Sequence, residues 1–545
     1  MKLKPDLLEA KHWIYPLNRP KRDYQFNIVK HCLFDNTIVA LPTGLGKTFI
    51  AGVVMLNFYR WFPEGKVVFV APTKPLVAQQ IEASHKTCGI PGSDAVELTG
   101  NVPKAARERA WCEKRVFYMT PQTLLNDLTK GTCEALDIVL IVVDEAHRAT
   151  GDYAYNQVVR YMMAKNPHFR LLALTATPGS TPEAVQNLID GLHISNIEIR
   201  DENSIDLRQY IHEKKIEQHI IQMDANIRKI RDPLARLMTN WARVPLMHTS
   251  RLARIMGYLV SFTLPSLFHF HPHVLSILRL LTNKTKLEGT IGMCYNSVKE
   301  IEQDVDDPKK KGGKKLASNP LFKEVAKALE QQRRPQPDPE HPGGFSMHPK
   351  MEKVKSIIID HFAQEMAENE GRDVENEAHN AAKIESRVMV FVTFREAVEE
   401  IVDALNFERP LIRATKFVGQ GLDKKGGKGL AQKEQLATVE KFKAGEYNVL
   451  VATSIGEEGL DIGEVDLIVC YDAQKTPIRM LQRLGRTGRK RAGVVHVLLA
   501  EGREELNLEK AKEAYKHVQQ SITRGESLEL YADVDRMLPD HIKPE

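Results

Sequence analysis

The sequence predicts an α/β protein in which two parallel-sheet domains flank a helical insert. Short apolar runs alternate with amphipathic stretches in the first third of the chain, and the same rhythm returns from residue 388 onward. Longer patterns with helical spacing of apolar residues lie between them. At the usual ~100–200 residues per domain, 545 residues also predict two to four domains rather than one core.

Five apolar runs of strand length predict the first sheet. Three are almost continuous in Val, Ile, Leu, Ala and Phe, which is typical of strands covered by helices on both faces. Turn residues such as Pro42, Pro72 and Pro121 follow these short runs and argue against buried helices. The predicted strands are Thr37 to Leu41, Lys66 to Ala71, Val116 to Met119, Ile138 to Val143 and Leu171 to Thr175.

Helical patterns without strand rhythm characterise residues 215–386, which we expect to form the insert. The clearest patterns are Ile227 to Thr239, Thr249 to Val260 and Val274 to Thr282. Two stretches inside it are predicted to be loops, the lysine-rich Asp304 to Lys315 and the Pro- and Gly-rich Arg333 to Gly344.

The α/β rhythm of the second domain predicts five further strands and one loop, Leu422 to Leu430, rich in Lys and Gly. The expected domains are 1–214 (first α/β domain), 215–386 (helical insert), 387–500 (second α/β domain) and 501–545 (C-terminal helical extension). The predicted strands are Val388 to Val392, Pro410 to Phe417, Val449 to Ala452, Leu467 to Tyr471 and Val494 to Leu499.

Composition indicates a soluble intracellular protein. No stretch supplies the ~18 uninterrupted apolar residues of a membrane helix, and Met1 to Pro5 lacks the apolar start of a secretory signal. The formal charge of +5 is too small to predict a basic surface, but it allows a local basic groove. The six cysteines never form a C-x-x-C pair, so we expect free thiols and neither structural zinc nor an iron–sulfur cluster.

A phosphate-binding loop is predicted directly after the first strand. Its glycines let backbone N–H groups surround phosphate oxygens at a helix N-terminus, the lysine reaches the β and γ phosphates, and the final threonine can bind Mg²⁺. The pattern departs from the usual one at Ala40, where a glycine is expected, and a chance match on a glycine-rich turn is the alternative. The candidate residues are Thr43, Gly44, Leu45, Gly46, Lys47 and Thr48.

An acidic pair at the end of another strand strengthens the nucleotide interpretation. Ile141 to Val143 runs into Asp144 and Glu145. We expect Asp144 to bind Mg²⁺ and Glu145 to orient or deprotonate the water that attacks the γ-phosphate. A solvated helix N-cap would explain one acidic residue but not its combination with a phosphate loop.

Three motifs in this order give the chain a resemblance to superfamily 2 helicases of the DEAH type. They are Asp144-Glu145-Ala146-His147, Leu174-Thr175-Ala176-Thr177-Pro178 and Gln482-Arg483-Leu484-Gly485-Arg486-Thr487-Gly488-Arg489. Further matching motifs extend the resemblance over residues 20–490. They are Gln25, Ala71 to Leu76, Thr120 to Leu124, Val390 to Arg395 and Ala452 to Ile462.

This resemblance implies two RecA-like domains with ATP and Mg²⁺ at their interface. Arg486 and Arg489 are then arginine fingers and Gln482 senses the γ-phosphate or the attacking water; a basic phosphate-binding surface is the alternative for the arginines. The remaining implied roles are adenine reading by Gln25, nucleotide contacts by Gly459 and ribose contact by Asp461. Coupling of ATP to nucleic acid is assigned to His147, Thr175 and Thr177.

The same resemblance implies a track along one nucleic-acid strand, whose phosphates are bound without sequence readout. Any one threonine in this set could instead be a helix cap or a packing position. The candidates are Thr73, Lys74, Thr120, Gln122, Thr393, Arg395 and Thr453.

Narrower features resemble the FANCM/Hef family of DNA helicases, in particular its fungal members. The helical insert and Glu457 to Ile462 are shared with RIG-I-like and Dicer helicases, but that RNA group typically has Cys where Ala146 stands. Leu41 to Thr48, Ala71 to Val77 and Gln432 to Gln435 also favour the FANCM/Hef side.

Membership of that family would imply ATP-driven 3′ to 5′ translocation on branched DNA in the nucleus, with DNA-repair proteins as partners. The expected reactions are fork reversal, Holliday junction migration and dissociation of displacement loops. A duplex-RNA translocase or sensor and an ATP-gated DNA clamp are the alternatives. The lysines of residues 309–315 could bind phosphates or form a solvated loop.

Overall fold

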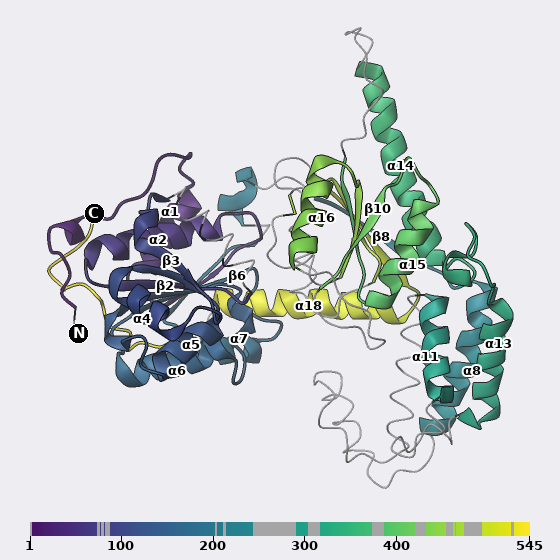
Figure 1. Ribbon diagram of the computed structural model, residues 1–545, viewed down its shortest axis with the longest axis horizontal. Helices are drawn as coiled ribbons and strands as arrows, with labels where there is room; N and C mark the ends of the chain where they lie inside the picture. Colours follow the sequence, from purple (N-terminus) through teal and green to yellow (C-terminus); the bar gives the residue numbers. More distant parts are fainter. Residues whose placement is uncertain are drawn as a thin grey trace.

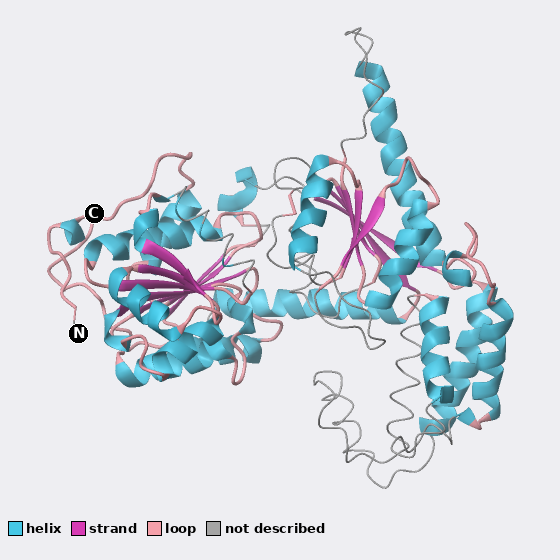
Figure 2. Ribbon diagram, in the orientation of Figure 1, coloured by secondary structure: helices cyan, strands magenta, loops and turns pink. Residues whose placement is uncertain are grey.

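The computed structural model contains two parallel β-sheets covered by helices, and a separate group of helices beside the second sheet (Figure 1, Figure 2). The α/β class with two such domains is as predicted. The structure describes residues 3–73, 77, 81, 85, 88–201, 204–210, 214–242, 290–303, 317–372, 386–419, 432–453, 462–463, 465–472, 493–524 and 528–545. Within these residues no helix is both long and apolar enough to cross a membrane.

The first sheet has seven parallel strands in the order β3-β4-β2-β5-β6-β1-β7. All five predicted strands are present, and the two that were not predicted, β3 and β7, form the edges. Their side chains are mostly half-buried, so neither carries a continuous apolar run. The strands are β1 (Thr37–Ala40), β2 (Lys66–Val70), β3 (Ala95–Leu98), β4 (Val116–Met119), β5 (Ile138–Val143), β6 (Arg170–Thr175) and β7 (Asn196–Ile199).

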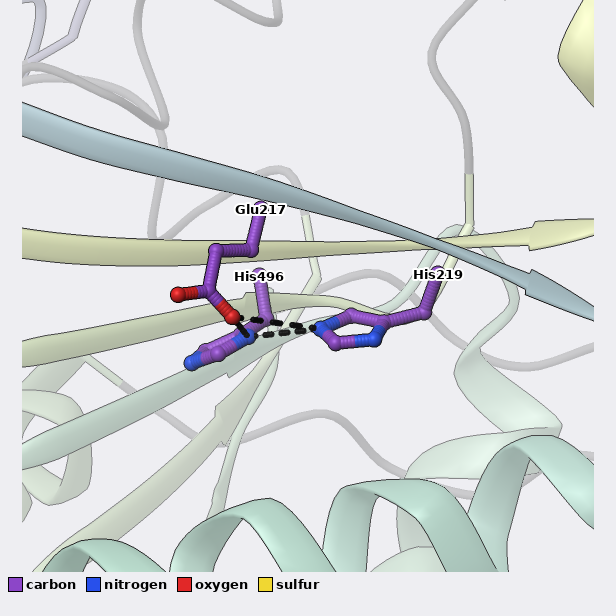
Figure 3. A group of neighbouring side chains, drawn as sticks. All are labelled: Glu217, His219 and His496. Carbon is purple, nitrogen blue, oxygen red and sulfur yellow. Dashed lines mark hydrogen bonds and ion pairs between the residues drawn. The ribbon is translucent and has the colours of Figure 1, made fainter.

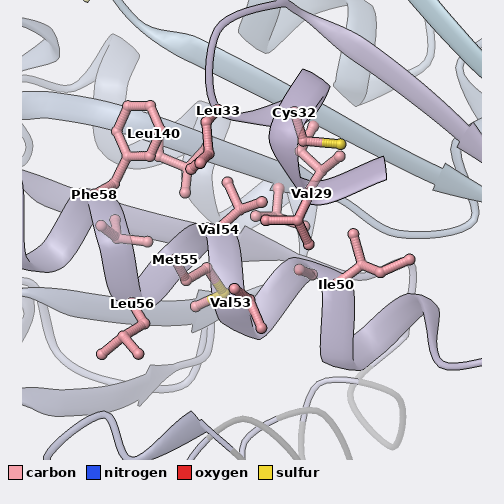
Figure 4. Packing of buried hydrophobic residues seen from close by; sticks show 14 of the residues in the cluster. Val29, Cys32, Leu33, Ile50, Val53, Val54, Met55, Leu56, Phe58 and Leu140 are labelled. Atoms are coloured by element: carbon pink, nitrogen blue, oxygen red, sulfur yellow. The ribbon is translucent and has the colours of Figure 1, made fainter. Parts of the chain in front are cut away.

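Two hydrophobic cores cover the two faces of this sheet, because successive strand residues point to opposite sides. Val67 belongs to the core under α1 and α2, and its neighbour Val68 to the core under α5, α6 and α7. Figure 4 shows the first of these cores, with α1 and α2 packed together and against Leu140 of β5. The helices are α1 (Asp23–Cys32), α2 (Lys47–Trp61), α4 (Lys104–Glu113), α5 (Pro121–Thr129), α6 (Ala154–Lys165) and α7 (Pro182–Leu192).

The second sheet has six parallel strands in the order β10-β11-β9-β12-β13-β8. Helices α15 (Arg395–Asn406) and α16 (Gln432–Ala444) belong to this domain. The predicted loop at 422–430 lies outside the described residues. The strands are β8 (Lys214–Ile221), β9 (Val388–Phe391), β10 (Ala414–Phe417), β11 (Val449–Ala452), β12 (Leu467–Cys470) and β13 (Gly493–Ala500).

The expectation that residues 215–386 contain no strand is wrong for β8, which pairs with β13 at the edge of the second sheet. An edge strand with polar residues between its isoleucines does not show the apolar run of a buried strand. Helix α14 (Pro349–Arg372) also lies in the predicted insert, yet Met351, Val354 and Ile358 share a core with Val388.

The remaining helices of the insert form a small unit of their own, with a shared core that includes Ile230, Cys294 and Phe322. These helices are α8 (Ala225–Ala242), α11 (Ile291–Gln303) and α13 (Pro320–Gln332). Residues 333–344, predicted to be a loop, contain the short 3-10 helix Pro342–Gly344 and an isolated antiparallel bridge between Asp338 and His341. The predicted helices at 249–260 and 274–282 and the lysine-rich stretch at 304–315 lie outside the described residues.

Helix α18 (Arg503–Arg524) joins the two α/β domains (Figure 1). Leu508 belongs to a core of the second domain and Val518 to a core of the first. Residues 528–545 are not helical and contact the first domain. The Tyr531 N–H donates to the Ile194 carbonyl at 2.9 Å, and the Arg170 guanidinium donates to the Asp535 carbonyl at 2.9 Å.

Candidate nucleotide and nucleic-acid site

Strand order brings the motifs of the first domain to one edge of its sheet. The carboxyl ends of parallel strands meet there, and open α/β sheets bind ligands at that edge. The nucleotide motifs follow β1, β5 and β6, which are neighbours, and the candidate nucleic-acid residues follow β2 and β4, which are also neighbours. The two sets therefore occupy adjoining halves of one edge.

The phosphate loop connects β1 to α2 through two glycines in left-handed conformation, Gly44 and Gly46, both at φ +85°. A side chain at Gly46 would place its Cβ 2.3 Å from the Gln25 amide nitrogen, so the loop requires glycine there for space as well as for conformation. Helix α2 begins at Lys47 without a side-chain cap among the described residues. Its first N–H groups are therefore suited to an anion.

Lys47 lies folded over its own loop, where its ammonium donates to the Leu41 carbonyl at 2.7 Å. This carbonyl can be replaced as a partner, because the same ammonium can reach phosphate oxygens bound by the loop. Thr48 follows it in the first turn of α2, where its hydroxyl can serve a metal ion.

Gln25 of α1 contacts the phosphate loop directly. Its amide donates to the Leu45 carbonyl at 3.0 Å, and the Tyr24 hydroxyl donates to the same carbonyl at 2.7 Å. The position agrees with a role at the nucleotide, while adenine reading stays a prediction. Tyr24 was not predicted, since a buried tyrosine has no local signal that separates it from a core residue.

The acidic pair follows β5 as predicted. Asp144 is 7% exposed, and burial together with the charge of Glu145 raises its pKa to about 7. Lys47 acts in the opposite direction. Because a cation would offset both causes, this carboxyl group fits a metal ligand. The Tyr155 hydroxyl, also missed from the sequence, donates to the Asp144 carbonyl at 2.6 Å and fixes the backbone here.

Glu145 adopts a left-handed backbone, φ +49°, which is strained for a non-glycine residue. Its Oε2 atom is buried and accepts no hydrogen bond from the residues that the structure describes. An unsatisfied buried carboxylate oxygen at a ligand edge suits the orientation of a water molecule.

A short chain of contacts leads from this carboxylate to β6. His147 Nδ1 lies 3.4 Å from Glu145 Oε2 and 3.2 Å from the Thr175 hydroxyl. That hydroxyl donates to the Thr177 carbonyl at 2.7 Å and accepts from the Thr177 N–H at 3.2 Å. Burial lowers the pKa of His147, so its imidazole is neutral at neutral pH. The three residues predicted to couple the two sites are thus in contact.

The candidate nucleic-acid residues of the first domain lie at the loop ends of β2 and β4. Thr73 and Gln122 are exposed. Thr120 stands at the N-cap position of α5, but its hydroxyl caps no backbone N–H and lies 3.1 Å from the Thr123 hydroxyl. Lys74 lies outside the described residues.

The second domain contributes candidates at the ends of β9 and β11. The Thr393 N–H donates to Asp472 Oδ2 at 2.6 Å, the Arg395 guanidinium donates to the Gly419 carbonyl, and the Thr453 N–H donates to the Phe417 carbonyl at 3.3 Å. The contact to Asp472 had no signal in the sequence. The other predicted residues of this domain lie outside the described residues: Gly459, Asp461, Gln482, Arg486 and Arg489.

Comparisons with known proteins match this arrangement. Residues 22–185 match the family model "DEAD/DEAH box helicase", and residues 373–491 match "Helicase conserved C-terminal domain". The chain is 45% identical over 568 residues to ATP-dependent DNA helicase mph1 of Aspergillus oryzae. It is 41% identical over 553 residues to ATP-dependent DNA helicase fml1 of Schizosaccharomyces pombe.

These matches cover 100% and 98% of this chain, but it spans only 49% of the Aspergillus protein and 63% of the Schizosaccharomyces protein. The crystal structure of the Hef helicase domain of Pyrococcus furiosus superposes with a TM-score of 0.59 at 32% identity, covering 89% of this chain and 97% of that one. The Hef helicase domain is matched along nearly its whole length, and the fungal proteins are matched along nearly all of this chain. The chain therefore belongs to the FANCM/Hef family of superfamily 2 DEAH-type helicases.

Proposed function

We propose that this chain is the motor of an ATP-dependent DNA helicase that remodels branched DNA in repair and recombination. Its substrates are replication forks, Holliday junctions and displacement loops, its direction of travel is 3′ to 5′, and it acts in the nucleus with other repair proteins. The observation that carries the proposal is the contact chain from Glu145 through His147 to Thr175, because it links the acidic pair after β5 to the Thr175 motif of β6, two of the motifs that resemble DEAH-type helicases.

ATP binds with its phosphates on the loop between β1 and α2. Lys47 exchanges its loop carbonyls for phosphate oxygens, while Thr48 and Asp144 would hold Mg²⁺, which neutralises charge on the phosphates when bound. Glu145 orients the attacking water through its unsatisfied Oε2 atom. The imidazole of His147, which is neutral at neutral pH, lies 3.4 Å from that oxygen without a hydrogen bond to it.

Hydrolysis depends on closure of the two domains. Arg486 and Arg489 enter the site from the second domain and stabilise the charge on the transferring phosphoryl group, and Gln482 detects the γ-phosphate. Residues of both domains hold the phosphates of one DNA strand, so alternate closing and opening moves the domains along that strand. Contacts to phosphates bind any sequence, which suits a motor that acts on structure.

Substrate preference is tested by steady-state ATP hydrolysis with matched forked DNA, linear duplex DNA, single-stranded DNA and duplex RNA. All four are compared at one salt concentration, because phosphate-dominated binding depends steeply on salt. Greatest stimulation by forked DNA supports the proposal. Greatest stimulation by duplex RNA contradicts the substrate class and leaves the ATP site intact.

The variant Lys47→Ala distinguishes a motor from an ATP-gated clamp. We expect it to abolish ATP turnover while forked DNA still binds. Arg486→Ala is expected to lower hydrolysis by ~10³-fold or more, as loss of an arginine finger does. Arg409→Ala, at an exposed arginine of the same domain, is the matched control and should hydrolyse ATP normally. Near-normal ATP turnover in Arg486→Ala would contradict the role of this arginine as an arginine finger.

Direction is tested with partial duplexes that carry either a 3′ or a 5′ single-stranded tail. Displacement of the strand next to the 3′ tail alone is the expected result, and displacement from the 5′ tail would reverse the proposed polarity.

A further inference from the structure

Three potential metal ligands lie together on the β8–β13 strand pair. Glu217 and His219 are two residues apart on β8 and therefore share one face of the strand. His496 of β13 stands opposite Glu217 in the parallel register. The three side chains point toward one another above the sheet (Figure 3).

One atom of each side chain faces the same point. His219 Nε2 lies 2.7 Å from His496 Nδ1, while Glu217 Oε2 lies 3.5 Å from the His496 nitrogen and 3.9 Å from the His219 nitrogen. Without an ion the two imidazoles share one N–H···N hydrogen bond. The side chains are 34%, 21% and 13% exposed for Glu217, His219 and His496, so the cluster is sheltered but open to ions.

Two imidazole nitrogens and one carboxylate oxygen are the donor set of open four-coordinate zinc sites. At Zn–N and Zn–O distances near 2.0–2.2 Å, tetrahedral ligand atoms stand about 3.3 Å apart. The three observed separations bracket that value. Small side-chain rotations that open the N···N contact and shorten the two N···O distances would therefore complete the geometry.

We propose that Glu217, His219 and His496 bind a Zn²⁺ ion that holds strand β8 to strand β13. Water occupies the fourth position. This proposal departs from the expectation of no structural zinc, which was based on the spacing of cysteines alone. Because β8 comes from the segment between the first domain and the insert, the ion ties that segment to the second domain.

Two neighbouring lysines set the electrostatics of the cluster. Lys215 lies 2.6 Å from the other oxygen of Glu217, Oε1, and so leaves Oε2 for the ion. Lys353 acts electrostatically on both imidazoles and opposes a cation there. The negative charge of Glu217 favours a cation at the cluster, so the affinity for Zn²⁺ should depend on both Glu217 and Lys353.

The test is titration of the chelator-treated, nucleotide-free chain with Zn²⁺ by calorimetry. We expect one tight site in the unmodified chain, and loss of affinity in His219→Ala and His496→Ala beyond the ~10–100-fold that removal of a second-shell partner costs. Glu217→Gln keeps the shape and should also weaken binding. Lys353→Met should bind more tightly. His541→Ala, at an exposed histidine outside the cluster, is the control and should bind as the unmodified chain.

Co²⁺ as a probe identifies the donor atoms. A His₂Glu site should give the visible bands of a four-coordinate ion without the near-ultraviolet thiolate band that cysteine ligands produce. Zn²⁺ should also raise the thermal midpoint of the unmodified chain, by roughly 5 °C at about 100-fold excess over Kd, and not that of His496→Ala. A thiolate band, or one equivalent of Zn²⁺ bound equally well by every variant, would overturn the assignment, as would Zn²⁺ affinity no tighter than millimolar.

Discussion

Thr175→Val tests the contact chain that links the acidic pair after β5 to the motif of β6. Valine has nearly the shape of threonine, so the substitution removes one oxygen atom and little volume. That oxygen makes three contacts, to the Thr177 carbonyl at 2.7 Å, to the Thr177 N–H at 3.2 Å and to His147 Nδ1 at 3.2 Å. Thr175 is 1% exposed, so water cannot replace it.

The size of the effect follows from these contacts. A buried donor or acceptor left without a partner costs about 1–3 kcal/mol. At 1.36 kcal/mol per factor of ten, this amounts to roughly 5–150-fold in the rate or equilibrium that depends on the contact. We expect DNA-stimulated ATP hydrolysis to fall by that factor, while hydrolysis without DNA changes less, because Lys47, Asp144 and Glu145 keep their places.

Thr177→Val is the matched control two residues away. Thr177 is equally buried, but its hydroxyl makes one long hydrogen bond, to the Gly179 carbonyl at 3.4 Å. Its loss should therefore change stimulation by only a few-fold. Hydrolysis is measured across a series of forked DNA concentrations for both variants. An effect of Thr177→Val as large as that of Thr175→Val would refute the chain as the route of coupling.

Three other residues give predictions that need different assays. Gly46→Ala should weaken ATP binding about tenfold or more, as measured by fluorescence titration. Adding Gln25→Ser should remove only the steric clash with the new Cβ atom, since the left-handed backbone still costs about 1–2 kcal/mol. Burial raises the pKa of Glu400 to about 7 from 4.5, so the folded chain holds a proton that the unfolded chain loses, and stability falls as pH rises through this window. Glu400→Gln should reduce that fall between pH 5 and pH 7 in urea unfolding, and the part that remains includes the contribution of Asp144. Lys350→Met should lower the free energy of unfolding by about 3–5 kcal/mol, because the buried Glu504 carboxylate, 2.5 Å from the Lys350 ammonium, would lose its charge partner. The double variant Lys350→Met with Glu504→Leu should recover most of that loss.

The interior strands of both sheets could be predicted because burial on two faces leaves a local mark, a continuous apolar run such as Ile138–Val143. Edge strands carry no such mark. β3, β7 and β8 each mix polar and apolar residues and were missed, whereas β10, the other edge strand, was predicted as part of Pro410 to Phe417. The placement of α14 on the second sheet was missed as well, because an amphipathic pattern predicts a helix but not the surface it covers.

The same distinction applies to the site. The phosphate loop and the acidic pair were predictable because each combines a strand end with neighbouring residues in one short motif. Tyr24, Tyr155 and Asp472 were not, since each acts through a contact to the backbone of another motif. The cluster of Glu217, His219 and His496 joins residues 277 positions apart through a strand pairing that was not predicted.

Both connections between the α/β domains meet the second domain at this strand pair. The chain enters β8 at Lys214 from the first domain and leaves β13 after Ala500 into α18; Lys214 pairs with Gly493, and Ile221 with Ala500. The two connections therefore lie at opposite ends of one strand pair. A rotation of the second domain about that pair leaves both connections attached to it. Such a rotation must still be accommodated along α18, which is docked on both domains. Its first turn is held by the buried contact between Lys350 and Glu504, whereas beyond its other end Gln186 and Glu529 share exposed hydrogen bonds. Since Val518 of α18 is also buried in a core of the first domain, this helix is anchored on both domains by buried contacts.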